Sequence, residues 1–198
     1  MLVVDGEFSG LNYDKHSIVS WGAIDLQNPD NQFYAECRVW DGAHIDPDGL
    51  AVNGFTEAEI TDPNKMTEAE LVRNFTAWSE TIADRTLAGQ NVSADRDMLR
   101  AATQRAGFEW NFAYRTIDTH TLCWMHMVKQ GIVPPVDEVH HRSALNLDAV
   151  LNYCGIPDEP EPHNALTGAK SHAEVISRLL YSKKLLPEFE QFEIPWIA

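Results

Sequence analysis

The order of strand-like and helix-like segments limits the fold more than any other feature of this sequence. Segments with strand character come first, at Leu2–Val4, His16–Leu26 and Phe33–Val39. From about residue 67 onward, short apolar segments alternate with amphipathic helical ones. Consecutive strands followed by strand–helix alternation predict an α/β domain in which a mixed central β-sheet is flanked by α-helices.

Local turn and cap signals divide these segments. Asn28–Asn31 consists of turn-forming residues, so we expect it to close a hairpin between the second and third strands. Thr67 and Glu70 form a capping box, which predicts a helix from there to about Asp84. Short strands at 86–90 and 115–118 and helices at about 94–106, 119–129, from a Ser143 cap to Cys154, and 165–181 complete the expected elements.

Length and composition favour one globular domain. The chain has 198 residues, of which 44% are hydrophobic and 23% charged. We expect residues 1–181 to form this domain and residues 182–198 to form an extended tail packed on it. No apolar run is long enough to span a membrane, and Met1–Asp5 does not resemble a signal peptide. Three cysteines without a C-x-x-C pair suit a reduced, cytoplasmic protein.

The strong negative charge restricts the partners. The formal net charge is −15, because 15 basic residues stand against 30 acidic ones. Proteins that hold long stretches of nucleic acid depend on many Lys and Arg contacts to phosphates. A nucleic-acid partner of this chain must therefore be short or held by its end, and its affinity should gain little beyond about six nucleotides.

Three separate segments carry candidate catalytic groups. Asp5 and Glu7 stand two residues apart at a strand end, so both point to one face, where a divalent cation would offset their repulsion. Asp95 opens a helix after a strand, where an acid also favours the helix dipole. His163 follows a proline-rich loop. Each segment alone also has a plain explanation: two solvated acids, helix-start electrostatics, or an exposed loop histidine.

Taken together, these segments resemble the DEDD-type 3′–5′ exonucleases of the histidine branch (DEDDh), which share a ribonuclease H-like fold. The group includes polymerase proofreading exonucleases, oligoribonuclease and ribonuclease T. Its first motif, D-x-E-x-[ST]-G, matches Asp5–Gly10, and Leu11 follows. Its second, an Asn shortly before an Asp that opens a helix, matches Asn91 and Asp95. Its third, H-[NR]-A-L, matches His163–Leu166.

The resemblance implies hydrolysis at the 3′ end of a single-stranded RNA or DNA, releasing nucleoside 5′-monophosphates. It implies a two-metal site for Mg²⁺ or Mn²⁺ with Asp5, Glu7 and Asp95 as ligands, and His163 as the general base. The residues implied to bind the terminal nucleotide are Phe8, Ser9, Gly10, Leu11, Asn53 and Asn91. Phe8 can stack on a base or pack in the core. A homodimer is a further expectation by analogy, and a membrane partner is not expected.

One position departs from the family. The fourth acid comes five residues after the histidine, where this chain has Gly168, and residues 167–172 contain no acid. His172 lies one turn further along the same helix face, so we expect that it, or a water it holds, partly replaces the acid. The alternative is that His172 is merely exposed to solvent and water completes the metal shell. An imidazole would favour Mn²⁺ over Mg²⁺, and Gly168→Asp should raise activity with Mg²⁺ if the helix leaves room. The alternatives are a catalytically weak or silent protein that binds strand ends and a structural metal-binding protein.

Overall fold

The central sheet is built around β1 (Leu2–Phe8) in a computed structural model that describes residues 1–197. The other strands are β2 (Ile18–Asp25), β3 (Asn28–Glu36), β4 (Leu87–Gly89) and β5 (Thr116–Asp118). They are ordered β3-β2-β1-β4-β5, with β1 antiparallel to β2 and parallel to β4. The mixed sheet expected from the sequence is therefore confirmed.

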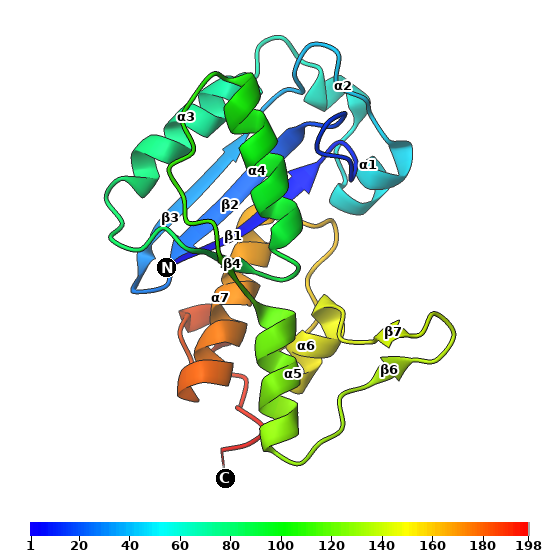
Figure 1. The fold of residues 1–198 in the computed structure, drawn as a ribbon, viewed down its shortest axis with the longest axis vertical. Helices are drawn as coiled ribbons and strands as arrows, with labels where there is room; N and C mark the ends of the chain where they lie inside the picture. The colour runs from blue at the N-terminus through cyan, green and yellow to red at the C-terminus, as the bar shows by residue number, and fades with distance from the viewer. Residues whose placement is uncertain (198) are drawn as a thin grey trace.

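Side chains of β1 alternate between the two faces of the sheet, as the strand period requires. Leu2 and Val4 are fully buried against the core formed with α3 (Glu68–Ser79) and α4 (Ser93–Arg105). Val3 is buried in a second core with Ala173 and Ile176 of α7 (Ala165–Tyr181). Helices thus cover both faces, with α3 and α4 on one side and α7 on the other (Figure 1).

The remaining helices extend this two-sided arrangement. α5 (Thr119–Lys129) and α6 (Leu147–Tyr153) pack with α7 around a third core that includes Cys123, Leu151 and Val175. α1 (Pro47–Asn53) and α2 (Glu57–Ile60) follow the sheet hairpin, and α1 lies by the end of β1 (Figure 1). β6 (Val136–Asp137) and β7 (Arg142–Ser143) form a small hairpin that projects from the body between α5 and α6 (Figure 1).

Capping side chains explain where α3 and α7 begin. Thr67 accepts a hydrogen bond from the backbone N–H of Glu70, and the Glu70 side chain accepts from Thr67 in return. This confirms the predicted capping box, a feature worth about 1 kcal/mol. α7 begins at Ala165 and ends at Tyr181, as predicted. Asn164 caps its start, because the Asn164 side chain accepts a hydrogen bond from the backbone N–H of Leu166.

Three boundary predictions were wrong. α3 ends at Ser79 and does not reach Asp84. Asn28–Asn31 begins β3, and the turn is formed by Leu26 and Gln27 instead. Pro29 is tolerated there because β3 is an edge strand of the sheet. Ser143 belongs to β7, and Asn146 is the residue that caps α6 by accepting from the backbone N–H of Ala149. The short elements α1, α2, β6 and β7 were not expected from the sequence.

The segment after α7 packs against the domain. It includes the short 3-10 helix η1 (Pro187–Phe189), and Leu186 and Ile194 are buried. Carbonyl oxygens of Phe189, Phe192 and Glu193 accept hydrogen bonds from the Arg178 guanidinium in α7. Within residues 1–197, none of the helices combines the length and the apolar character needed to cross a bilayer.

Candidate functional site

A cavity of about 450 Å³ opens where β1 ends, between α1 and the start of α4. Most of the residues expected to form the site line it: Asp5, Glu7, Phe8, Gly10, Leu11, Asn53, Asn91 and Asp95. They come from β1, from the loop after it, from α1, from the β4–α4 connection and from the first turn of α4. Segments far apart in the sequence therefore meet at one end of the sheet.

Three carboxylates line this cavity, those of Asp5, Glu7 and Asp95, and the charge of a fourth, Glu159, acts on Asp5 and Glu7. Burial raises the pKa of Asp5 well above its ordinary value, and the charges of the other three raise it further. Burial also raises the pKa of Glu7 to about 8, with smaller contributions from Glu159 and Asp95. Burial raises the pKa of Asp95 to about 7, against the opposing effect of hydrogen bonds from its own backbone and from Gly6.

Glu7 has the least compensated carboxylate of the expected ligands. Its side chain is only 8% exposed, and no donor within residues 1–197 hydrogen-bonds its carboxylate. It lines the cavity next to Asp5, which projects from the same face of β1. A buried carboxylate without a partner is costly, so a cationic ligand at this place would be favourable.

The glycine between the two acids allows a close approach of aromatic rings. A Cβ atom at Gly6 would lie 2.7 Å from the Phe8 ring and 2.8 Å from the Trp21 ring. Phe8 packs against the core on the α3–α4 side and also lines the cavity. The two roles considered for Phe8, core packing and contact with a base, are therefore both sterically open to it.

The loop after β1 divides into a fixed part and an exposed part. The Ser9 hydroxyl donates to the carbonyl of His44 (2.8 Å) and accepts from the backbone N–H of Ser17 (2.9 Å). The backbone groups of Ser9 are also hydrogen-bonded within the protein, which leaves it no free donor. Gly10 and Leu11 both line the cavity, and Leu11 is 91% exposed. An exposed leucine at a cavity mouth is suited to packing against a ligand.

Two asparagines fix the walls of the cavity. The buried Asn53 side chain donates to the carbonyl of Phe8 (3.1 Å) and accepts from the backbone N–H of Phe55 (3.2 Å). It thereby ties α1 to the end of β1. Asn91 has a φ of 49°, a left-handed conformation that Asn tolerates better than most residues. Its backbone turn directs the chain from β4 into α4 and Asp95.

His163 lies in the loop between α6 and α7 and does not line the 450 Å³ cavity. Its position follows from its neighbours. Burial raises the pKa of Glu159, and the nearby His163 opposes that shift. On one side of His163, Asn164 caps α7 and donates to the Tyr34 hydroxyl (3.1 Å). On the other side, Pro162 approaches α1 so closely that a Cβ at Gly54 would lie 2.5 Å from it.

The structure explains the glycine at position 168. A Cβ atom there would lie 2.1 Å from Asp5 Oδ2 and 2.8 Å from Asp5 Cγ. The helix is held this close because the Ala165 carbonyl lies against Gly22 of β2, where a Cβ would be 2.1 Å from its oxygen. The expectation that Gly168→Asp raises activity depended on open space, and that space is closed.

A second correction concerns the acids around Gly168. The sequence offers none between residues 167 and 172, yet Glu159 Oε1 lies 3.2 Å from the position of a Gly168 Cβ. Glu159 was not among the candidate residues expected from the sequence. No local pattern distinguishes it from Glu161 in the same loop, so the sequence carried no signal for it.

His172 is buried beneath the sheet end. It is 1% exposed, and its Nδ1 lies 3.2 Å from the carbonyl oxygen of Val4, the residue before Asp5. Burial lowers the pKa of His172 to about 4, so the ring is neutral at physiological pH. Its Nε2 is buried without a hydrogen-bond partner among the described residues. The alternative that His172 is merely exposed to solvent was wrong.

The carboxylates share a cavity, but they do not converge on one point. Among residues 1–197, no three His, Cys, Asp or Glu side chains form a group able to hold a metal ion as they stand. Their chemistry is suitable, because carboxylate oxygens are the ligands that Mg²⁺ and Mn²⁺ prefer.

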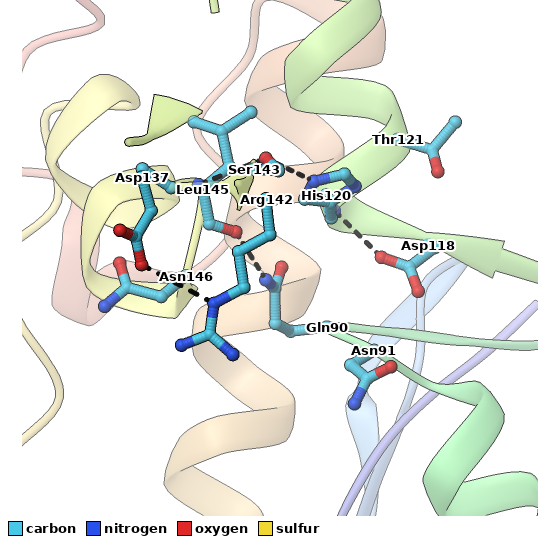
Figure 2. Close-up of a pocket in the computed structure, with 11 residues that line it drawn as sticks. Gln90, Asn91, Asp118, His120, Thr121, Asp137, Arg142, Ser143, Leu145 and Asn146 are labelled. Atoms are coloured by element: carbon cyan, nitrogen blue, oxygen red, sulfur yellow. Dashed lines mark hydrogen bonds and ion pairs between the residues drawn. The ribbon is translucent and has the colours of Figure 1, made fainter. Parts of the chain in front are cut away.

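A second cavity of about 700 Å³ adjoins the first and shares Gln90 and Asn91 with it. Figure 2 shows Arg142 reaching into this space from the β6–β7 hairpin, with its Nε 3.6 Å from Asp137 Oδ2. His120 Nε2 lies 2.8 Å from Ser143 Oγ, which links α5 to the same hairpin. No role was expected for this hairpin from the sequence.

Comparisons with known proteins agree with this geometry at the level of the fold. No family model and no curated protein matches the sequence. Among solved structures, the nuclease domain of 3'hExo, a DEDDh family member bound to rAMP, is similar with a TM-score of 0.68 and 15% identity, covering 93% of each chain.

Two further solved nucleases are similar over most of this chain. Cell-death related nuclease 4 (CRN-4) has a TM-score of 0.71 at 14% identity over 92% of this chain and 64% of its own. Exonuclease I of E. coli, in complex with a dA16 oligonucleotide, has a TM-score of 0.69 at 17% identity over 92% of this chain and 40% of its own. This chain therefore shares the ribonuclease H-like fold of these exonucleases.

Proposed function

We propose that this protein is a divalent-metal-dependent 3′–5′ exonuclease that hydrolyses phosphodiester bonds at the 3′ end of single-stranded nucleic acid and releases nucleoside 5′-monophosphates. The observation that carries this proposal is the meeting of Asp5, Glu7 and Asp95 at one cavity with too little compensating charge. The fold shared with solved exonucleases supports it.

The carboxylates of Asp5, Glu7 and Asp95 would hold the cations. Glu7 is nearly buried and has no donor, so a cation would supply the missing partner. When bound, two divalent cations would stabilise the attacking and leaving oxygens of the phosphodiester. Water as a nucleophile also needs a base, and the imidazole of His163 would accept its proton. The Asn164 cap and the Pro162 contact keep that loop near the carboxylates.

The terminal nucleotide would occupy the 450 Å³ cavity. Leu11 would pack against its base or sugar, Phe8 offers an aromatic face, and Asn91 lines the wall. Because Gln90 and Asn91 border both cavities, the strand can continue into the second one, where Arg142 is available to a phosphate. The chain has few basic residues with which to bind further phosphates along a strand, and this favours short substrates.

The similar structures are consistent with a single-stranded substrate, but they do not show whether its sugar is ribose or deoxyribose. Exonuclease I of E. coli was solved with dA16 and with dT13 oligonucleotides, and the 3'hExo nuclease domain with rAMP. We therefore propose RNA or DNA ends as the substrate class of this chain. Expectations of a homodimer and of a cytoplasmic location remain predictions from the sequence.

Labelled oligonucleotides test the proposal. RNA and DNA oligomers carrying a 5′ label are incubated with the protein in Mg²⁺, Mn²⁺ or a chelator. We expect a ladder that shortens from the 3′ end, mononucleotide products, and no reaction with chelator. Asp5→Asn protein purified in parallel is the control for contaminating nucleases. Cleavage that survives the chelator, or release of the 5′ label first, would rule out the proposed reaction. Binding without cleavage would favour the strand-end-binding alternative.

A further inference from the structure

Glu159 and Asp5 both lie close to the same point of α7. A Cβ at Gly168 would lie 2.1 Å from Asp5 Oδ2 and 3.2 Å from Glu159 Oε1. Asp5 comes from β1 and Glu159 from the loop between α6 and α7. The surface of the helix at Gly168 therefore brings together two carboxylates from different parts of the chain.

The Glu159 carboxylate is turned inward and lacks a partner. Its Oε1 is buried and makes no hydrogen bond within residues 1–197. Its charge acts on both Asp5 and Glu7, which places it beside the expected ligands and not on the outer surface of the loop. Asp158, the residue before it, is held by a hydrogen bond from Asn152 Nδ2 (2.9 Å). This hydrogen bond ties the chain next to Glu159 to Asn152 of α6.

No acid can take this place from position 168 itself. The contact of 2.1 Å between a Gly168 Cβ and Asp5 Oδ2 would force Asp5 or the helix to move. The helix cannot easily retreat, because the Ala165 carbonyl lies directly on Gly22 of β2. A carboxylate close to Gly168 must therefore come from another segment of the chain.

We propose that Glu159 is the fourth acidic metal ligand of this protein and takes the role for which position 168 has no side chain. The inference rests on the proposed function and adds a residue to its site. Glu159 would complete a set of four acids with Asp5, Glu7 and Asp95. The Glu7 and Glu159 carboxylates, both without donors, would turn toward the cation together.

Glu159 suits this role better than His172. The described hydrogen bond of His172 goes to the Val4 carbonyl through Nδ1, and a carboxylate adds the negative charge that an imidazole lacks. Higher activity with Mn²⁺ than with Mg²⁺ was expected because an imidazole ligand favours Mn²⁺. With a carboxylate in its place, Mg²⁺ should serve as well as Mn²⁺.

Manganese binding measured by electron paramagnetic resonance tests the assignment without depending on turnover. Free Mn²⁺ is titrated against the full chain, freed of metal, for wild type, Glu159→Gln, Glu159→Asp and Glu161→Gln. Glu161 is the matched control, because it lies in the same loop and is exposed. We expect Glu159→Gln to weaken binding at least about tenfold and Glu161→Gln to equal wild type. Glu159→Asp keeps the charge and should be intermediate.

The outcomes separate this inference from the proposed function. Wild-type protein that binds no Mn²⁺ would overturn both. Wild-type binding with an unchanged affinity in Glu159→Gln would overturn the role of Glu159 alone. The same conclusion holds if Glu159→Gln leaves Mn²⁺ affinity unchanged and alters only the dependence of the rate on pH. Glu159 would then act on His163 and not on the metal. Thermal unfolding in chelator verifies folding, and the Glu159→Asp result decides the matter if Glu159→Gln does not fold.

Discussion

α7 borders two groups of buried charge that differ in how they are neutralised. Toward its end, Glu174 and Arg178 are both fully buried and form an ion pair of 2.7 Å. The Arg178 guanidinium also donates to carbonyls of Cys154, Phe189, Phe192 and Glu193. Glu174 Oε2 accepts from the backbone N–H groups of Leu185 and Leu186. Each charge there has its partners within the chain.

Near the start of α7 the pattern is reversed. Asp5, Glu7, Asp95 and Glu159 are gathered with only a few backbone donors and the nearby His163. Burying charges without partners is unfavourable, and the chain avoids it at Glu174 and Arg178. We propose that the first group has a structural role, whereas the second binds a positively charged ligand. The following predictions separate the two groups, beginning with the largest effect.

Asp5→Asn should remove activity without loss of fold. Asp5 contacts α7 and is acted on by all three other carboxylates, so we expect turnover to fall on the order of a thousandfold or more. Because the change removes an uncompensated charge, stability in chelator should stay equal or rise. Single-turnover rates and urea unfolding measure the two effects. A variant that loses stability but keeps its turnover would reverse the assignment of the two groups.

Arg178→Met should show the opposite behaviour. It leaves Glu174 buried without its partner and removes donors from four carbonyls of the packed tail and the α6 end. We expect a loss of about 3–5 kcal/mol in the free energy of unfolding. The folded fraction should keep the wild-type turnover, which is measured at low temperature. A stable variant with impaired turnover would give Arg178 a role in the site.

His163→Ala should lower turnover by about a hundredfold while binding of the oligonucleotide changes little. The reason is that His163 lies beside the acids but does not line the cavity for the terminal nucleotide. Steady-state kinetics and a binding titration in Ca²⁺ distinguish the two effects. A loss confined to the Michaelis constant would show that His163 only holds the substrate.

The metal-free protein should lose stability as pH rises through the neutral range. The folded pKa of Glu7 is about 8 and that of Asp95 about 7, against ordinary values of 4.5 and 3.8. The folded state therefore holds protons that the unfolded state has lost, which gives stability that disappears as pH rises through the folded pKa values. His172, with a folded pKa of about 4, acts in the opposite sense only below about pH 6.5.

Urea unfolding in chelator from about pH 6.5 to about pH 8.5 measures this loss, which should be on the order of 1 kcal/mol per pH unit. Glu7→Gln should flatten the slope, and added Mn²⁺ should reverse it. Glu174→Gln provides the matched comparison, because it should lower stability at every pH and leave the slope unchanged. A wild-type stability independent of pH across this range would contradict the picture of uncompensated carboxylates.

The sequence was informative where local rules decide the structure. The strand at Leu2–Val4, the Thr67 capping box and the limits of α7 depend on neighbours in the chain, and they were predicted correctly. The turn between β2 and β3 was misplaced, because the pairing of an edge strand overrode the turn preference of Asn28–Asn31. The β6–β7 hairpin is too short to give a clear sequence pattern.

The site was only partly accessible from the sequence, for a different reason. The meeting of Asp5, Glu7, Asn91 and Asp95 in one site was expected because their motifs resemble those of the DEDDh exonucleases. Glu159 was missed because nothing near it in the chain indicates that the loop turns it toward Asp5. Gly168 suggested a missing ligand, while the structure shows a helix packed too closely for any side chain.

Calorimetric titration of Mn²⁺ into the metal-free protein near pH 7, in two buffers of different ionisation enthalpy, tests the central claim most directly. If a cation binds among Asp5, Glu7 and Asp95, the raised pKa values require protons to leave as it binds. We predict binding accompanied by release of roughly one proton, and no such binding in Asp5→Asn. Binding without proton release, or binding that is the same in Asp5→Asn, would contradict the claim that these carboxylates form the metal site.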